Sequence, residues 1–314
     1  MRLLITGGAG YLGSVLTRHL LIRGHQVTVL DNLIYHQTQT SLLQHCYDDK
    51  FDFVHGDARD ERALRPLLAQ HDFIIPLAAI AGAPACDRDP GMAESVNFGA
   101  IELLNRLRSS TQSLIYPASN SGYGATTGDI PCTEETPLEP ISLYGITKVR
   151  AESMLLDSQN VISLRLATLF GVSQRMRLDL LVNNFTYRAV SDRFLVLYEA
   201  HFKRSYLHVE DAARAFCHCI DHFPGMRGEA YNVGLDGANL SKLELAEKIG
   251  EHVPELYIHC AEVGEDPDKR NYVTSYEKIG AHGFKACYSL DDGIHQLLKA
   301  FRMLRTTDWG YVKI

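Results

Sequence analysis

Three residues in the middle of the chain have the types and the spacing of a site for chemistry on a hydroxyl group. Ser119 precedes Tyr144 by 25 positions, and Lys148 follows Tyr144 by four. Positions i and i+4 of a helix share a face, so the phenol and the ammonium are expected to lie together. A phenol, with a pKa near ~10, is a weak base at neutral pH unless a nearby positive charge stabilises the phenolate. We therefore predict that Ser119, Tyr144 and Lys148 are catalytic and act on an alcohol or a ketone.

A glycine-rich turn near the start of the chain has the pattern of a dinucleotide cradle. Gly7, Gly10 and Gly13 are three positions apart and lie between an apolar run and a helical pattern. The first two glycines allow a tight turn and a close approach of the backbone to pyrophosphate, and the third allows the helix to pack on the strand. The free N–H groups of the helix N-terminus attract phosphate. With the downstream triad, this cradle, which includes Tyr11 and Leu12, predicts a nicotinamide-dependent oxidoreductase.

An acidic residue at the end of the second apolar run distinguishes between the two nicotinamide cofactors. Asp31 follows Gly13 by 18 positions, where a carboxylate accepts hydrogen bonds from both ribose hydroxyls and repels a 2′-phosphate. No arginine is next to it in the sequence, so the predicted cofactor is NAD. Asn97 either supports the site or is an amide on a helix surface. The other predicted cofactor contacts follow the second, third and fourth strands or belong to the triad: Asn32, Asp57, Ala58, Leu77, Ala78, Ala79, Tyr144 and Lys148.

Short apolar runs alternate with helical patterns through the first half of the chain. Strands are predicted at residues 2–6, 26–31, 51–55, 73–76, 113–116 and 161–166. Helices are predicted after Gly10, around 63–69, across 93–107 and across 143–156. Unbroken apolar strands that alternate with helices are typical of a parallel sheet buried on both faces. The predicted fold class is therefore α/β, with a Rossmann-type doubly wound parallel sheet.

The alternation becomes less regular after residue 170. A helix is predicted at 180–189, a strand at 194–198 and a helix at 243–252. We interpret these elements as a smaller, mixed α/β C-terminal substrate lobe that covers the carboxyl edge of the sheet. The predicted NAD-binding domain comprises residues 1–170 and about 201–232, and the lobe comprises about 171–200 and 233–314, so the two units interleave.

Composition and charge exclude several classes of protein. The 314 residues are 46% hydrophobic, which is enough for a large core, and carry a net charge of −7, which argues against nucleic acid or an anionic membrane as a partner. No apolar run reaches the ~18 residues of a membrane span, and no signal peptide precedes the first strand. The seven cysteines are scattered, and Cys217 and Cys219 point to different faces of a helical pattern. We therefore predict a cytoplasmic protein with reduced thiols and no metal site.

These motifs resemble the extended short-chain dehydrogenase/reductase family, specifically its nucleotide-sugar epimerases, dehydratases and dehydrogenases, over essentially the whole chain. The similar segments are 6–13, 56–57, 97, 123–124, 144–148, 165–170, 204–211 and 231–234. The resemblance implies that the triad removes a hydride from sugar C4, that the lobe binds a nucleoside diphosphate sugar, and that the protein is a homodimer. It also implies that Arg204 contacts the diphosphate and Arg270 a phosphate or the nucleotide. The stretch 175–183 is implied to line the pocket, although its Met and Leu side chains fit the lobe core equally well. The substrate-binding residues implied in this way are Ser121, Thr168, Arg175, Arg177, Asp179, Asn183, Arg204 and Arg270.

The chain departs from the family pattern directly after the active-site serine. The 4,6-dehydratases carry an Asp-Glu pair there, which exchanges protons at C5 and C6, whereas this chain has Asn120 and Ser121. Neither side chain does acid–base work, so dehydration is not expected. The sequences of segments 120–124, 175–183 and 264–270 look most like those of the GDP-D-glycero-D-manno-heptose 4-dehydrogenases of surface-polysaccharide pathways. We expect an NAD-dependent nucleotide-sugar 4-dehydrogenase; the alternatives are a C4 epimerase and a redox-sensing protein that binds NAD without catalysis.

Overall fold

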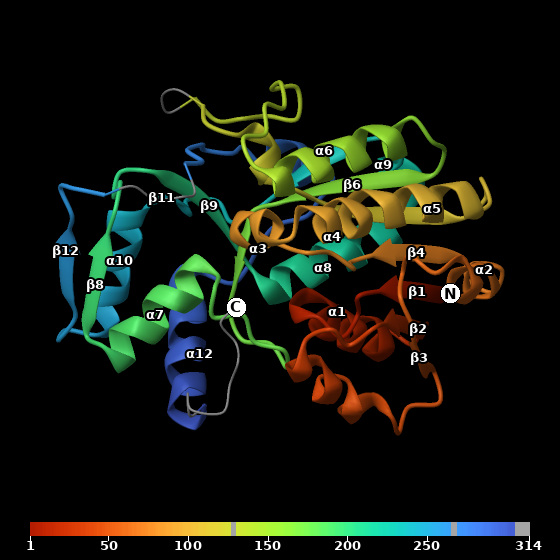
Figure 1. Cartoon of the computed structure of the whole chain (residues 1–314), viewed down its shortest axis with the longest axis horizontal. Helices are drawn as coiled ribbons and strands as arrows, with labels where there is room; N and C mark the ends of the chain where they lie inside the picture. Colours follow the sequence, from red (N-terminus) through yellow and green to blue (C-terminus); the bar gives the residue numbers. More distant parts are fainter. Residues whose placement is uncertain (127–129, 265–268, 305–314) are drawn as a thin grey trace.

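A seven-stranded sheet forms the centre of the computed structural model, which describes residues 1–126, 130–264 and 269–304 (Figure 1). All neighbouring strands are parallel, in the order β10–β6–β5–β4–β1–β2–β3. The strand order reverses between β1 and β4, and such sheets bind ligands outside the carboxyl ends of the strands at that point. In sheet order the strands are Ala230–Val233, Val161–Leu166, Ser113–Ser119, Phe73–Pro76, Arg2–Thr6, Gln26–Asp31 and Phe51–His55.

Helices cover both faces of this sheet because its strands are apolar on both faces. In β1, Leu3 and Ile5 face one core while Leu4 faces the other, and all three are fully buried, as the alternation of side chains along a strand requires. The first core is completed by α1 (Tyr11–Ile22), α8 (Val209–Asp221), α9 (Phe223–Met226) and α11 (Glu277–Ala281). The second is completed by α2 (Glu61–Leu68), α5 (Ala100–Leu107) and α6 (Leu143–Leu156). Two short helices, α3 (Ala83–Arg88) and α4 (Pro90–Glu94), precede α5.

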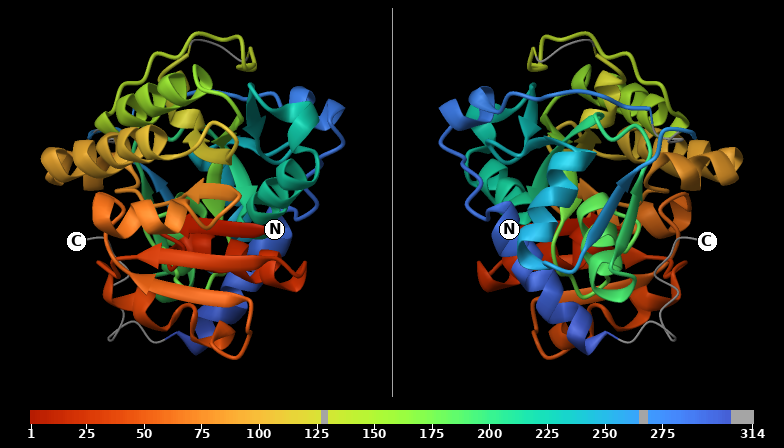
Figure 2. Two further views of the ribbon diagram at one scale, coloured as in Figure 1. Left: turned by 90° about the vertical axis from the view of Figure 1, so that its right-hand side faces the viewer. Right: turned by 90° about the vertical axis from the view of Figure 1, so that its left-hand side faces the viewer.

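A smaller lobe with its own hydrophobic core lies at the left of Figure 1 and faces the viewer in the right-hand view of Figure 2. A three-stranded sheet, in the order β11–β9–β7, lies between this lobe and the main sheet. Helices α10 and α12 each begin with a capping box, in which Ser241 or Ser289 is the N-cap, and this arrangement satisfies two exposed backbone donors. The lobe and the three-stranded sheet comprise β7 (Thr168–Phe170), α7 (Leu181–Ser191), β8 (Phe194–Leu197), β9 (Lys203–His208), β11 (Asn239–Ser241), α10 (Lys242–His252), β12 (Tyr257–Cys260) and α12 (Leu290–Met303).

The predicted fold class is confirmed, and most of the predicted elements are present. Strand β5 continues three residues beyond its predicted end and carries Ser119 to the edge of the sheet. The single helix predicted at 93–107 is instead α4, a π-helical turn at Ser95–Gly99, and α5. The seventh strand of the sheet, β10, was not predicted. Strand β10 is far from its neighbour β6 in the sequence, so the local alternation of strands and helices does not predict it.

One segment of the predicted lobe packs against the main sheet. Residues 233–314 were assigned to the lobe, yet Tyr276, Ile279 and Phe284 belong to the core beneath the main sheet. The reason is that α11 packs on β10, which completes that sheet. The last residues of the predicted lobe, 305–314, lie outside the described residues. In the described part of the chain, no helix is both long and apolar enough to cross a membrane.

Candidate functional site

One cavity follows the carboxyl edge of the sheet from β3 to β6 and extends to the lobe. All predicted cofactor contacts except Asn97 line it, and so do all three predicted catalytic residues. The lining residues that were predicted for the cofactor are Gly7, Gly10, Tyr11, Leu12, Gly13, Asp31, Asn32, Asp57, Ala58, Leu77, Ala78, Ala79, Tyr144 and Lys148. The fold therefore brings together residues from the first and second quarters of the chain at the point where the strand order reverses.

The glycines of the first turn are required by close backbone packing. Gly7 has a φ of +74°, and a Cβ at this position would lie 2.5 Å from the backbone nitrogen of Ala78. A Cβ on Gly13 would lie 2.6 Å from the Cα of Gly8, so the turn packs tightly against the helix that follows. Gly10 caps α1 without any side chain, and the first N–H groups of this helix therefore stay available to a phosphate.

Asp31 ends β2 with its carboxylate held by the backbone. One oxygen accepts a hydrogen bond from the N–H of Ala9 at 3.0 Å, and the other accepts one from the N–H of Leu33 at 2.8 Å. Burial raises the pKa of Asp31, while these two hydrogen bonds and the nearby charge of Arg175 lower it. Each carboxylate oxygen has a second lone pair, so a pair of ribose hydroxyls can still donate to it.

The other predicted acidic contact is fixed by ion pairing. Asp57 accepts two hydrogen bonds from the Arg59 guanidinium, at 2.9 and 2.7 Å, and one from the Asn32 amide at 3.1 Å. The hydrogen bonds from Arg59 are the main reason that the pKa of Asp57 falls to about 2. Asp57 is therefore an ionised acceptor among the predicted cofactor contacts.

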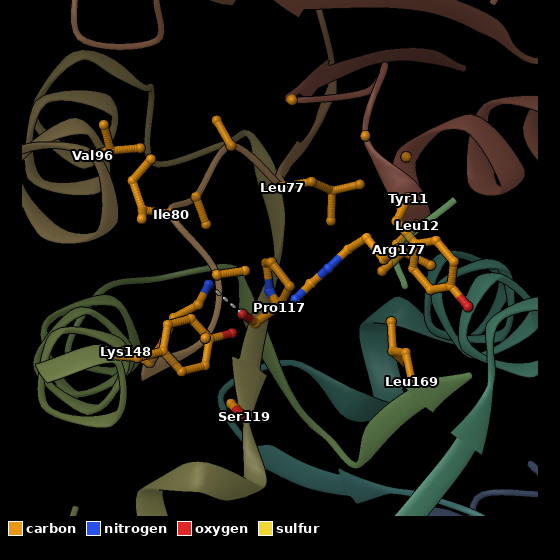
Figure 3. A pocket seen from close by; sticks show the side chains of 18 of the residues that line it. Tyr11, Leu12, Leu77, Ile80, Val96, Pro117, Ser119, Lys148, Leu169 and Arg177 are labelled. Atoms are coloured by element: carbon orange, nitrogen blue, oxygen red, sulfur yellow. Dashed lines mark hydrogen bonds between the residues drawn. The ribbon is translucent and has the colours of Figure 1, made fainter. Parts of the chain in front are cut away.

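The catalytic side chains meet between β5 and α6. Helix α6 begins at Leu143, with Ser142 as its N-cap, so Tyr144 and Lys148 lie on one face in its first two turns. Ser119, at the end of β5, has its hydroxyl 2.8 Å from that of Ser121. Lys148 donates to the carbonyl of Pro117 at 2.7 Å, as Figure 3 shows. Burial lowers the pKa of Lys148 to about 7.

The charges that act on Tyr144 differ from those expected from the sequence. Burial raises the pKa of the Tyr144 phenol, and the guanidinium groups of Arg177 and Arg270 and the hydroxyl of Ser119 lower it. The sequence had assigned the lowering to Lys148, but the Lys148 amine is directed to the carbonyl of Pro117. The two arginines come from segments far away in the sequence, so the spacing of the triad carried no sign of them.

Asn97 supports the site from behind the cavity. Its amide oxygen accepts from the N–H of Ile80 at 2.8 Å, and its amide nitrogen donates to the carbonyl of Ile80 at 3.0 Å. The same nitrogen is 3.4 Å from the hydroxyl of Thr147. Asn97 therefore fastens the loop after β4 to helix α6, between Tyr144 and Lys148. It sits in the π-helical turn, a distortion that often accompanies functional sites, and it was predicted as a cofactor contact although it does not line the cavity.

The predicted substrate residues separate into two groups. Five of them line the cavity: Ser121, Thr168, Arg175, Arg177 and Arg270. Asp179 and Asn183 lie behind Arg177 and hold it: Asp179 accepts from the Arg177 Nε at 3.0 Å, and Asn183 donates to the Arg177 carbonyl at 2.9 Å. Arg204 is a buried residue of β9 and is not among the described residues that line the cavity.

The segment 175–183 contributes both to the lining of the cavity and to the lobe core, the two interpretations that the sequence left open. Arg175 and Arg177 line the cavity, whereas Met176 and Leu178 are buried in the lobe core. Of the similar run at 264–270, residues 265–268 lie outside the described residues. Arg270 is described, and it donates to the Ser121 hydroxyl at 2.5 Å.

Several lining residues were not predicted, including Tyr35, Ile80, Val96, Leu169 and Tyr272. Ile80 lies on the loop after β4, and Val96 lies on the π-helical turn. No local sequence pattern predicted that these two residues line the cavity. The apolar character of Tyr35 and its position shortly after Asp31 were available signals for a residue near the adenosine end.

The neighbours of Ser119 were the basis for excluding dehydration. Asn120 is fully buried, and its amide nitrogen is directed to the hydroxyl of Thr274 at 3.3 Å. Ser121 faces the cavity. The carboxylate of Glu134 accepts a hydrogen bond from the N–H of Asn232 at 2.6 Å. Glu134 is not among the residues that line the cavity. Among the described lining residues the acidic ones are Asp31 and Asp57, both at the end of the cavity opposite Ser119.

The residues present fit NAD. The glycine turn packs without side chains against Ala78, the N-terminus of α1 has no side-chain cap, and the carboxylate of Asp31 has acceptor capacity left. In this arrangement the turn and α1 would hold the pyrophosphate, Asp31 the adenosine ribose, and Tyr144 and Lys148 the nicotinamide ribose. In the described ranges, no group of three or more His, Cys, Asp or Glu side chains could hold a metal ion.

Comparison with known proteins agrees with this interpretation. The model of the NAD dependent epimerase/dehydratase family matches residues 3–234. The low-salt glycan biosynthesis protein Agl12 of Haloferax volcanii is 31% identical over 306 residues, which cover 94% of this chain and 96% of that protein. The dTDP-glucose 4,6-dehydratase of Streptomyces niveus is 32% identical over 79% of this chain and 76% of its own length.

Solved structures show the same fold. The UDP-glucose 4-epimerase of Thermus thermophilus, solved in complex with NAD, superposes with a TM-score of 0.81 at 24% identity and covers 96% of this chain and 99% of its own. The match of the family model spans the sheet, the cradle and the triad, and the Haloferax relative extends the similarity across the lobe. The chain therefore belongs to the NAD dependent epimerase/dehydratase family and is an NAD-dependent enzyme of the extended short-chain dehydrogenase/reductase type.

Proposed function

We propose that the protein is a nucleotide-sugar 4-dehydrogenase, which oxidises the C4 hydroxyl of a nucleoside diphosphate sugar to a ketone in surface-polysaccharide biosynthesis. GDP-heptose is the first substrate to test. The observation that carries the proposal is the pairing of Ser119 and Tyr144 at one end of a dinucleotide cavity whose described acidic residues, Asp31 and Asp57, are at the other end. Oxidation at C4 needs the first pair only, whereas elimination of water needs a further acid and base.

The chain's own groups account for the proton in this reaction. When bound, NAD accepts the hydride that leaves C4. The Tyr144 phenolate takes the proton of the C4 hydroxyl, and the electron pair of the broken O–H bond forms the C=O bond. Ser119 hydrogen-bonds the same oxygen and keeps it beside Tyr144. Arg177 and Arg270 lower the pKa of Tyr144 and thereby favour the form that accepts the proton.

We assign the remaining substrate contacts to the lobe side of the cavity. Arg270 and Ser121, which are hydrogen-bonded to each other, would bind a phosphate group, since charge-assisted contacts suit phosphate. Arg204 is proposed as a further diphosphate anchor, which requires its buried side chain to become accessible from the cavity. Thr168 lines the sugar end. We also propose that the protein is a homodimer.

A C4 epimerase is the second candidate. Relatives of this chain include the UDP-glucose 4-epimerase of Lactobacillus helveticus, which is 28% identical over 85% of this chain. Epimerisation uses the same residues and returns the hydride to the other face of the ketone. The third possibility, a redox sensor, does not need a Ser–Tyr–Lys triad, and the presence of all three residues in one cavity weighs against it.

Product analysis across a panel of nucleotide sugars tests the proposal. The purified protein is incubated with NAD and GDP-heptose, UDP-glucose or dTDP-glucose, and the products are weighed by mass spectrometry and assigned by NMR. A product that lacks two hydrogens, formed with one NADH, is expected. An unchanged mass with inverted C4 would make the protein an epimerase, and the loss of one water would refute the argument from Asn120 and Ser121. Tyr144→Phe is the blank in every case.

A further inference from the structure

The loop that follows β7 crosses the glycine cradle and is fastened to it. The carbonyl of Tyr11 accepts from the Ser173 hydroxyl at 2.7 Å, and the hydroxyls of Ser14 and Ser173 are 2.9 Å apart. The Tyr11 hydroxyl donates to the carbonyl of Gly171 at 2.7 Å. All these atoms belong to buried contacts. A segment that begins the lobe is thus bound to the first turn of the helix that faces the cofactor pyrophosphate.

Side chains of this loop alternate between two destinations. Arg175 and Arg177 face the cavity, and Met176 and Leu178 between and after them are buried in the lobe core. The two apolar side chains anchor the loop in the lobe core, and the arginine side chains between them and before them are directed to the cavity. The loop therefore presents two guanidinium groups to one cavity and is anchored behind them.

The two guanidinium groups occupy different ends of the cavity. Arg175 lies over the ring of Tyr35, with its Cζ 4.6 Å from the ring centroid, and its charge acts on Asp31. Arg177 is paired with Asp179 by two hydrogen bonds and acts on Tyr144. Figure 3 shows the side chain of Arg177 entering the cavity from the side opposite Lys148. Arg175 is therefore at the adenosine end, which is remote from the triad.

We infer that residues 171–177 form a clasp over the dinucleotide, in which Arg175 binds the adenosine half of NAD and not the nucleotide sugar. A guanidinium beside the Asp31 carboxylate and above an aromatic ring is suited to the ribose and phosphate oxygens of an adenosine diphosphate group. Because the clasp crosses the cradle and is anchored in the lobe, release of NAD requires the loop to separate from α1.

The test measures cofactor binding in the absence of any sugar, so its result is independent of the proposed reaction. NAD, ADP-ribose and GDP are titrated into the NAD-free protein by calorimetry, and the NADH dissociation rate is measured by displacement with excess NAD. Arg175→Met should weaken NAD and ADP-ribose binding by about ten- to a hundredfold, as expected for loss of a charge-assisted contact. NADH dissociation should accelerate by a similar factor, while GDP affinity stays within about twofold of the wild type, as expected for a ligand that makes no contact with Arg175.

Arg188→Met is the matched control. Arg188 lies on α7 of the same lobe, pairs with Asp192 at 3.3 Å, has a partly exposed side chain and does not line the cavity, so this variant should bind all three ligands like the wild type. Arg175→Lys, which keeps the charge but not the planar fork, should show an intermediate loss and replaces Arg175→Met if the latter unfolds. Unchanged NAD binding in either Arg175 variant, or a loss confined to GDP, would overturn the inference.

Discussion

The adenosine end of the cavity consists mainly of the first glycine turn and the residues that end or follow β2 and β3, with Arg175 from the lobe, whereas the sugar end presents side chains from four distant segments. At the first end, Gly7 and Gly13 allow close contacts that a Cβ would prevent, and Asp31 is held by two backbone N–H groups. At the second end, Ser119 and Tyr144 meet Arg177 and Arg270, which belong to loops of the lobe. The cofactor end thus depends mainly on the main sheet, whereas the sugar end depends on the main sheet for Ser119 and Tyr144 and on the lobe for Arg177 and Arg270.

Because of this difference, the two ends of the cavity tolerate different changes of sequence. A change in the turn at Gly7 must move β4 or α1, since Ala78 is already in contact, so the cradle accepts one class of cofactor. Replacement of the Arg177 or Arg270 side chain alters charge and shape at the sugar end. Many sugars can therefore be processed by one cradle and one triad, and substrate identity lies in the loops.

Removing the phenol tests the sugar end most severely. Tyr144→Phe should lower turnover by ~10²–10⁴-fold, because it deletes the group that accepts the C4 proton. NAD binding should stay near normal, since the cradle and Asp31 are untouched. The measurements are the rate of NADH formation and the NAD dissociation constant. Tyr47→Phe, at a tyrosine that is 95% exposed, is the matched control, and a Tyr144→Phe enzyme with wild-type turnover would remove Tyr144 from the mechanism.

The same contrast explains which parts could be predicted from the sequence. The cradle, Asp31 and the Tyr144–Lys148 pair were predicted because each depends on a strand end or on one helix, where local spacing fixes geometry. The action of Arg177 on Tyr144 and the contact of Arg175 with Tyr35 depend on how a lobe loop crosses the sheet. Such long-range placement leaves no periodic pattern in the sequence.

Two further outcomes illustrate the limit. Strand β10 joins the sheet through pairing with β6, and only tertiary packing specifies that contact. Arg204 was implied by resemblance to touch the diphosphate, but a resemblance carries the residue type and not the path of the side chain. In the structure this side chain is 3% exposed, and its guanidinium donates to the carbonyl of Lys203 at 2.9 Å.

The next smaller effect is expected at the phosphate side of the sugar end. Arg270→Met should weaken binding of a nucleoside diphosphate by about ten- to a hundredfold, the value of a lost charge-assisted contact. Affinity for NAD should not change, because Arg270 lies with Ser121 and not at the cradle. Calorimetry with GDP, UDP and NAD measures both. Arg204→Met, compared in the same assay, decides between the two arginines: a loss in Arg204→Met alone would transfer the diphosphate contact from Arg270 to Arg204.

The smallest expected effect is a displaced pH profile, and it tests whether the lobe acts on the chemistry. Arg177 lowers the pKa of Tyr144, so its removal in Arg177→Met should raise that pKa, because a nearby opposite charge is lost. Oxidation requires the phenolate, and a higher pKa leaves a smaller fraction of it at any pH below the pKa. The rise of turnover with pH should therefore move to higher pH at saturating substrate. Arg177→Lys, which keeps a positive charge, should move the profile less, and Arg188→Met should not move it. Identical profiles for Arg177→Met and the wild type would show that the charge on the lobe loop does not reach Tyr144, and the sugar end would then depend on the lobe for binding alone.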